Sequence, residues 1–140
     1  MERPNVLLIV VDQWPGAFLG IGGRRDIETP TLDQLARNGA RFSNAHSECP
    51  ICIPARRSLM TGTDPRTHGD RVFQPKLARS DVPHMAEVFH RAGYQTGSVG
   101  KFHVFPARDR IGFEETVLFE EGRPGLGGPD DWDIWLADQG

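Results

Sequence analysis

The sequence has few cysteines, no long apolar run and no excess of positive charge. Two cysteines in 140 residues cannot form the disulfide framework of a small secreted domain. No apolar stretch approaches the roughly 20 residues that cross a membrane as a helix. Lysine and arginine number 16 against 19 acidic residues, the net charge is −3, and the arginine pairs at 24–25 and 56–57 are isolated. These absences argue against a disulfide-stapled domain, a membrane-spanning chain and a nucleic-acid binder.

What remains is the composition of an ordinary globular protein. Hydrophobic residues make up 38% of the chain and charged residues 25%, and the length fits one domain. The apolar stretch after Arg3 is short for a signal peptide, and no small-residue cleavage site follows it. We therefore expect a cytoplasmic protein.

The first apolar run, residues 5–11, predicts a strand buried on both faces within a parallel sheet. Asp12 and Gln13 follow at its carboxyl end, where open α/β sheets place their ligand sites. Asp12 is therefore a candidate for chemistry, although an aspartate in such a loop can equally well cap local backbone.

Further along, the residue patterns alternate between helix and strand, which predicts a layered α/β fold. We interpret the histidines at 46, 68, 84 and 90 as surface or loop residues. The patterns predict helices over 29–39, 80–93 and from Asp130 onward, strands over 40–45 and 94–99, and an irregular stretch over 104–128.

The most informative stretch is Cys52-Ile-Pro-Ala-Arg-Arg-Ser-Leu-Met-Thr-Gly62. Pro54 suits the first turn of a helix and Gly62 suits its end, so a short helix is expected from about Pro54 to Thr61. Cys52 would lie at the positive end of this helix, and Arg56 would return to the same face one turn later. A sulfur atom, a helix start that favours anions and a guanidinium group together suit a tetrahedral oxyanion substrate.

Cys-x-Pro-x-Arg followed by Met-Thr-Gly resembles the signature of the type I sulfatases in the alkaline phosphatase superfamily, in which the cysteine is oxidised to formylglycine. Gly100-Lys-Phe-His103 resembles the Gly-Lys-x-His motif of that family, and Gly112-Phe113 resembles the Gly-Phe that follows it. In an extended segment, Lys101 and His103 would point to the same face.

The resemblance covers nearly all of this chain but only the N-terminal part of a family member. It implies that residues 1–140 are the N-terminal portion of a sulfatase catalytic domain. The implied fold is alkaline phosphatase-like, with layers around a mostly parallel central sheet.

The resemblance implies hydrolysis of a small-molecule sulfate ester. A formylglycine-generating enzyme would convert Cys52 to formylglycine, whose aldehyde would be hydrated to a diol. One hydroxyl of the diol would attack sulfur, and the other would help to expel sulfate. A divalent cation, Ca²⁺ in the first place and Mn²⁺ or Mg²⁺ otherwise, would bind Asp12, Gln13 and the residue derived from Cys52. Arg56 would stabilise the diol, Lys101 would neutralise the transferring group, and His103 would aid breakdown of the covalent intermediate.

Gln13 leaves a second substrate class open. Many sulfatases carry an aspartate there, and an Asp-Gln pair resembles the choline-sulfatase-like and phosphonate-monoester-hydrolase-like branches. Hydrolysis of phosphonate monoesters or phosphodiesters is therefore the alternative. Because these oxygen ligands are few, the isolated 140 residues are expected to bind metal weakly and to turn over little substrate.

Two other interpretations stay open. One is a non-catalytic fragment that retains only elements of the fold. The other is a thiol oxidoreductase built on Cys49-Pro-Ile-Cys52, a Cys-x-x-Cys motif at a helix start.

Overall fold

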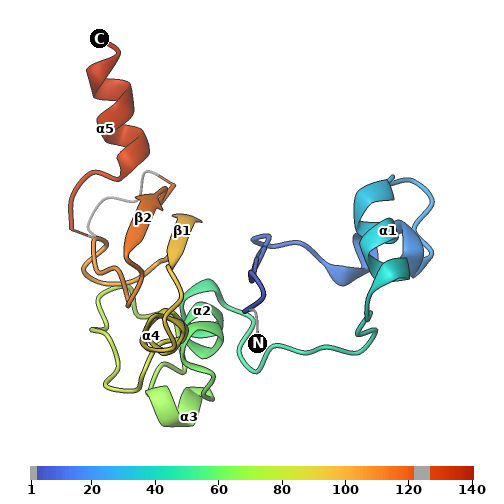
Figure 1. The fold of residues 1–140 in the computed structure, drawn as a ribbon, viewed down its shortest axis with the longest axis horizontal. Coiled ribbons are helices and arrows are strands. Elements are labelled where there is room, and N and C mark those ends of the chain that lie inside the picture. Colours follow the sequence, from blue (N-terminus) through green and yellow to red (C-terminus); the bar gives the residue numbers. More distant parts are fainter. Residues whose placement is uncertain (1–2, 122–126) are drawn as a thin grey trace. The chain divides into compact units, whose positions relative to one another are not determined.

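The computed structural model describes residues 3–121 and 127–140. The chain divides into two compact units, unit 1 (Met1–His46) and unit 2 (Ser47–Gly140). Unit 1 contains the short 3-10 helices η1 (Gly16–Phe18) and η2 (Gly20–Gly22) and the helix α1 (Pro30–Asn38). Unit 2 contains α2 (Cys52–Thr61), α3 (Pro65–His68), α4 (Met85–Arg91), β1 (Gly97–Gly100), β2 (Glu115–Leu118) and α5 (Asp131–Asp138) (Figure 1).

Helix α1 confirms the prediction over 29–39. It begins after Thr29, because Pro30 is suited to the first helical position. The Thr29 hydroxyl accepts the backbone N–H of Gly20 at 2.8 Å, and the Asp33 carboxylate accepts that of Ile21 at 3.0 Å. The start of α1 therefore holds η2 in place.

Residues 5–11 form no strand, contrary to the prediction. Within the described part of unit 1, residues 3–46, no segment forms a strand, so this run has no hydrogen-bonding neighbour in its own unit. Its six aliphatic side chains are consequently 50–84% exposed. The strand predicted over 40–45 is absent for the same reason.

The sheet of unit 2 is a parallel pair of short strands. Gly97 of β1 lies opposite Glu115 of β2, and Gly100 lies opposite Leu118. Strand β1 confirms the prediction over 94–99, although it begins and ends later. Strand β2 lies in the stretch 104–128 that was predicted to be irregular, of which residues 122–126 lie outside the described residues.

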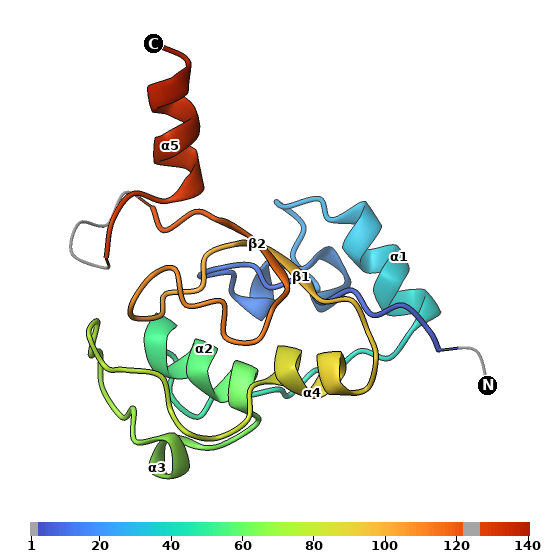
Figure 2. The ribbon, with the colours of Figure 1, turned by 60° about the vertical axis from the view of Figure 1, so that its left-hand side comes forward.

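The core of unit 2 lies where the strand pair meets α2. Phe102, Ile111 and Leu118 are buried together, and Met60 of α2 packs against them. Phe113 stacks on Phe102 with ring centroids 5.4 Å apart. Helices α2 and α4 contact each other, and both lie beneath the strand pair in Figures 1 and 2. Apolar packing therefore fastens α2 to the segment that follows β1.

Local signals explain most helix ends in unit 2. Helix α2 begins at Cys52 and ends at Thr61. Gly62 follows it with a positive φ of 65°, and its backbone N–H donates to the carbonyl of Ser58 at 2.8 Å. Helix α4 is shorter than predicted, because Pro83 disfavours helical geometry in the residue before it. Asp130 begins α5 by accepting the backbone N–H of Asp133 at 2.9 Å, as predicted.

None of the helices in residues 3–121 and 127–140 is long and apolar enough to cross a bilayer.

Gly112→Ala should destabilise the protein more than Gly69→Ala does. Both glycines have a positive φ, 94° and 81°, so both variants lose about 1 to 2 kcal/mol from backbone strain. Only the new Cβ at position 112 meets other backbone, with the Glu87 nitrogen at 2.8 Å, whereas nothing lies within 4 Å of one at position 69. The clash should add about 1 to 3 kcal/mol, measured by urea unfolding of both variants. Equal losses would show that the Glu87 backbone moves aside freely.

Candidate active site

Cys52 is the first residue of α2 and is partly buried. Ile51 precedes it in an extended conformation, and its side chain caps none of the N–H groups of the first turn. The start of α2 therefore has the partial positive charge that favours an anion. This confirms the predicted placement of Cys52 at the positive end of a helix.

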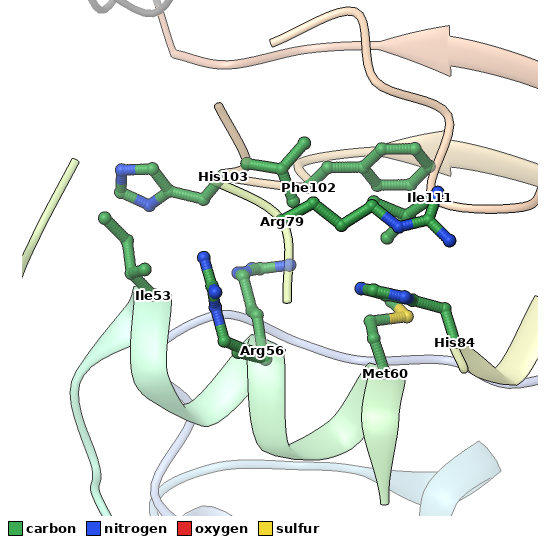
Figure 3. Close-up of a pocket in the computed structure, with 10 residues that line it drawn as sticks. Ile53, Arg56, Met60, Arg79, His84, Phe102, His103 and Ile111 are labelled. Carbon is green, nitrogen blue, oxygen red and sulfur yellow. The ribbon is translucent and has the colours of Figure 1, made fainter. Parts of the chain in front are cut away.

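Arg56 joins α2 to the segment that follows β1. Its guanidinium donates to the backbone carbonyl of Lys101 at 2.5 Å. Figure 3 shows Ile53, Arg56 and Met60 rising from one side of α2 towards Phe102 and His103. The spacing of three and four residues places these side chains on one face of the helix.

His103 is 3% exposed, and its backbone has a positive φ of 57°. The ring of Phe73 meets the His103 ring edge to face, with centroids 5.6 Å apart. The backbone is therefore not extended at His103. The expectation that Lys101 and His103 share a face assumed an extended backbone, so it does not apply here. Lys101 makes an ion pair with Glu121, its ammonium lying 3.2 Å from each carboxylate oxygen.

Glu120, which the motifs do not include, contacts the same segment. Its carboxylate is buried, and one oxygen accepts the backbone N–H groups of both Phe102 and His103 at 2.8 Å. The acidic pair Glu120-Glu121 directly after the run Thr116-Val-Leu-Phe119 was the available signal in the sequence.

A small pocket of about 20 Å³, room for about one water molecule, brings Arg56 and His103 together. Among the described residues, those that line it include no acidic side chain. Figure 3 shows basic side chains such as Arg56 and His103 interleaved with apolar ones such as Ile53 and Phe102. The full lining is Ile53, Arg56, Arg57, Met60, Arg79, His84, Phe102, His103, Val104 and Ile111.

Two of the pocket arginines are held by carboxylates from elsewhere in unit 2. Arg57 lies 3.3 Å from the fully buried carboxylate of Asp70 and donates to the carbonyl oxygens of Leu77 and Ala78. Arg79 forms an ion pair with Glu87. These two arginines are therefore fixed as parts of the framework around the pocket.

Ser58 and His68 form a hydrogen-bonded pair that resembles part of a serine-hydrolase triad. The Ser58 hydroxyl lies 2.9 Å from Nε2 of His68, and the backbone N–H of Asp70 donates to Nδ1 at 3.2 Å. Because Nδ1 accepts this bond, the proton of the neutral ring lies on Nε2, which donates to Ser58. His68 therefore cannot take the serine proton, and the pair ties α2 to α3.

His68 and His84 are buried, contrary to the prediction that they lie in a loop and on a helix surface. They are 6% and 4% exposed. Burial lowers the pKa of each ring, with Arg57 acting in the same direction on His68 and Arg79 on His84. His46 is exposed, as predicted, and so is His90.

The predicted metal ligands Asp12 and Gln13 lie in unit 1, at a turn where Gln13 has a φ of 53°. The other predicted site residues all lie in unit 2. Carboxylate and amide oxygens are of the type that Ca²⁺ binds, so the donor types fit a hard cation. Within the described residues, no group of three or more His, Cys, Asp or Glu side chains gathers closely enough to hold an ion.

The Cys-x-x-Cys pair consists of two free thiols. Cys49 and Cys52 are both partly buried, and the Cys49 sulfur lies 3.8 Å from the carbonyl oxygen of Arg71. Only Cys52 belongs to α2.

Comparison with known proteins decides the family. Residues 4–134 match the sequence model described as Sulfatase. The chain belongs to the sulfatase family. It is 39% identical over 118 residues to an arylsulfatase of Clostridium perfringens (strain 13 / Type A), an alignment that covers 84% of this chain and 24% of that protein. It is 39% identical over 117 residues to a choline-sulfatase of Rhizobium meliloti (strain 1021), covering 82% of this chain and 22% of that one.

A solved structure supports the sulfatase fold. The crystal structure of Ps i-CgsB matches 99% of this chain and 32% of its own, with a TM-score of 0.76 and 31% identity. The alkaline phosphatase-like fold predicted from the sequence is confirmed. This sulfatase-family chain spans about a quarter of the length of the curated relatives it matches.

Acid should destabilise unit 2 of this sulfatase-family chain through its two buried histidines. The pKa of His68 and that of His84 lie below the ordinary value of 6.5, so the unfolded chain binds protons more readily than the folded one. The free energy of unfolding should therefore fall as the pH drops through 6.5. Burial raises the pKa of Asp70, which changes stability in the opposite direction.

Urea unfolding at pH about 7.5 and about 5.5 measures this effect. His68→Gln keeps an N–H donor for Ser58 but does not titrate, so its loss of stability on acidification should be roughly half that of the wild type. The comparison isolates His68, because Asp70 and His84 are common to both proteins. An equal loss in the variant and the wild type would contradict the assignment.

Proposed function

We propose that this chain carries the nucleophile side of a site that hydrolyses sulfate esters, with Cys52 converted to formylglycine by a formylglycine-generating enzyme. The observation that carries the proposal is the hydrogen bond from Arg56 to the Lys101 carbonyl. It joins the helix that begins at Cys52 to the segment that holds His103. The four predicted catalytic residues thus belong to two segments that are bonded to each other.

The charges around this junction suit an oxyanion. The start of α2 favours negative charge, and Arg56 lies one turn further on the same helix. Lys101 adds an ammonium group whose role would be to neutralise charge on the transferring sulfate. The His103 ring can hold or give a proton, which would serve the departing alcohol or the breakdown of the covalent intermediate.

Two groups complete the proposed site. Formylglycine at position 52 would supply a hydrated aldehyde as the nucleophile. A divalent cation, Ca²⁺ in the first place, would be held by Asp12, Gln13 and further ligands, and it would polarise the substrate oxygens. The oxygen donors of Asp12 and Gln13 are of the right chemical type for such a cation.

The names of the relatives support sulfate esters as the substrate class, since one is an arylsulfatase and another a choline-sulfatase. Gln13 favours a second candidate function. A neutral amide in place of a second carboxylate lowers the negative charge around the metal, as in the phosphonate monoester hydrolases that Asp-Gln resembles. Phosphonate monoesters therefore belong in the same assay.

Cys52→Ser should abolish hydrolysis of an aryl sulfate such as 4-nitrophenyl sulfate, because a formylglycine-generating enzyme that oxidises a cysteine thiol leaves serine unchanged. An unoxidised serine lacks the second hydroxyl of the hydrated aldehyde, which would expel sulfate. The full-length protein, produced together with a formylglycine-generating enzyme and loaded with Ca²⁺, is the form to assay. Mass spectrometry of the peptide that contains position 52 should show the aldehyde in the wild type alone.

Cys49→Ser is the matched control and should keep both the aldehyde and the activity. Loss of activity in both cysteine variants, together with disulfide reductase activity of the wild type, would support the thiol oxidoreductase instead. Turnover of a phosphonate monoester but no sulfate ester would favour the second candidate function.

Arg56→Ala should mainly lower activity, whereas Arg57→Ala should mainly lower stability, although the two residues are neighbours. Arg56→Ala should lower kcat by about 100-fold or more, because it removes a cation and the bond to the Lys101 carbonyl. Arg57→Ala leaves the Asp70 carboxylate buried beside no cation, which should lower the free energy of unfolding by about 3 to 5 kcal/mol. Kinetics and urea unfolding of both variants test this division, and a reversed pattern would exchange the two roles.

A further inference from the structure

The two strands of unit 2 end side by side, and the residues that follow them run together. Gly100 and Leu118 form the last pair of the parallel ladder, and the backbone N–H of Phe119 donates to the carbonyl of Gly100 at 3.1 Å. Lys101, Phe102 and His103 therefore lie beside Glu120 and Glu121. The contact arises because parallel strands have their carboxyl ends at the same edge of a sheet.

The side chain of Glu120 binds the backbone of this segment. Its side chain is 3% exposed, and a single carboxylate oxygen accepts the N–H groups of Phe102 and His103, each at 2.8 Å. Successive N–H groups that converge on one anionic oxygen form an anion-binding concavity, which requires a left-handed residue nearby. His103, with its φ of 57°, is that residue.

The left-handed conformation at His103 has an energetic cost. The conformation is unfavourable for a residue with a Cβ, so surrounding contacts must hold it in place. A buried, charge-assisted pair of hydrogen bonds is strong enough to offset that cost. Glu120 is itself anchored, because its own backbone N–H donates to the buried Asp130 carboxylate at 2.6 Å.

Glu120 and its neighbour Glu121 act on different parts of the segment. Glu121 pairs with the Lys101 ammonium, and Arg56 donates to the Lys101 carbonyl. Phe102 is fixed by its side chain in the core, where it packs with Ile111 and Leu118. Two hydrogen bonds to Glu120 hold the backbone N–H groups of Phe102 and His103.

We propose that Glu120 is a positioning residue for His103: its buried carboxylate holds the Phe102–His103 backbone in the left-handed turn that presents the imidazole ring to the pocket. The inference rests on the proposed function, in which His103 transfers a proton. Glu120 touches neither the substrate nor the reacting atoms in this assignment, and it acts only through the backbone of His103.

Two replacements separate shape from hydrogen bonding. Glu120→Gln keeps a carbonyl oxygen where both N–H groups bond, so it should keep kcat within about threefold of the wild type. Glu120→Met has a similar volume but no strong acceptor, and it leaves two buried N–H groups without a partner. It should lower kcat by about 10- to 100-fold, with little change in KM, because the imidazole is displaced rather than removed.

The matched control is Glu114→Met. The Glu114 carboxylate accepts the backbone N–H of Thr96 at 2.8 Å, at the opposite end of the same strand pair. It lies away from the candidate active site, so its removal should lower the thermal midpoint while kcat stays near the wild-type value. Equal losses of kcat in Glu114→Met and Glu120→Met would mean that general loosening of the strands is responsible, and the proposal would be overturned.

A double-mutant cycle tests whether Glu120 acts through His103. In a His103→Ala background, adding Glu120→Met should lower kcat by less than about threefold, because the group that it positions is already gone. If the two losses in kcat multiply instead, Glu120 has another role and the inference is wrong.

Amide hydrogen exchange provides a readout that does not depend on turnover. Exchange in the peptide spanning residues 101–104 should be faster in Glu120→Met than in the wild type, and unchanged in Glu120→Gln and Glu114→Met. If the wild type hydrolyses no sulfate ester, the proposed function fails, and exchange still decides whether Glu120 holds this turn. If exchange in Glu120→Met equals that of the wild type, the positioning role is refuted whatever the activity.

Discussion

The hydrogen bond from Arg56 to the Lys101 carbonyl joins residues that lie 45 positions apart in the sequence. It connects the amino-terminal half of α2 to the end of β1, and apolar packing of Met60 against Phe102 supports it one turn further along the helix. Because guanidinium is planar and always charged, it can bind a backbone carbonyl and still present positive charge to an anion. The same side chain thus fixes the geometry of the site and contributes to its electrostatics.

Other basic side chains that line the pocket are paired with carboxylates or buried. Arg57 forms an ion pair with Asp70 and Arg79 forms one with Glu87, so carboxylates from other segments oppose the charge of both arginines. His84, which also lines the pocket, is buried, and burial lowers the pKa of its ring. The fold therefore opposes the charge of these two arginines with carboxylates that come from outside the pocket lining.

The parts of the fold that follow local rules could be predicted from the sequence. Gly62 ends α2 and Asp130 begins α5, because each acts on the backbone within a few residues of itself. Burial of His68 and the role of Glu120 could not be predicted, since both depend on contacts with distant segments. The run over 5–11 was predicted from its composition alone, yet a strand also needs a neighbour for its hydrogen bonds.

The Gly-Lys-x-His motif also combines a feature that the sequence predicts with one that depends on a distant contact. Its spacing identifies Lys101 and His103, but an extended segment would have placed both side chains on one face. The left-handed backbone at His103 changes that geometry, and its hydrogen-bond partner is a carboxylate 17 residues further along the chain. The motif therefore specifies which groups are present, while their orientation depends on the acceptor that β2 brings alongside. A chain with the same four residues but no acceptor at this position would have to hold its histidine by other contacts.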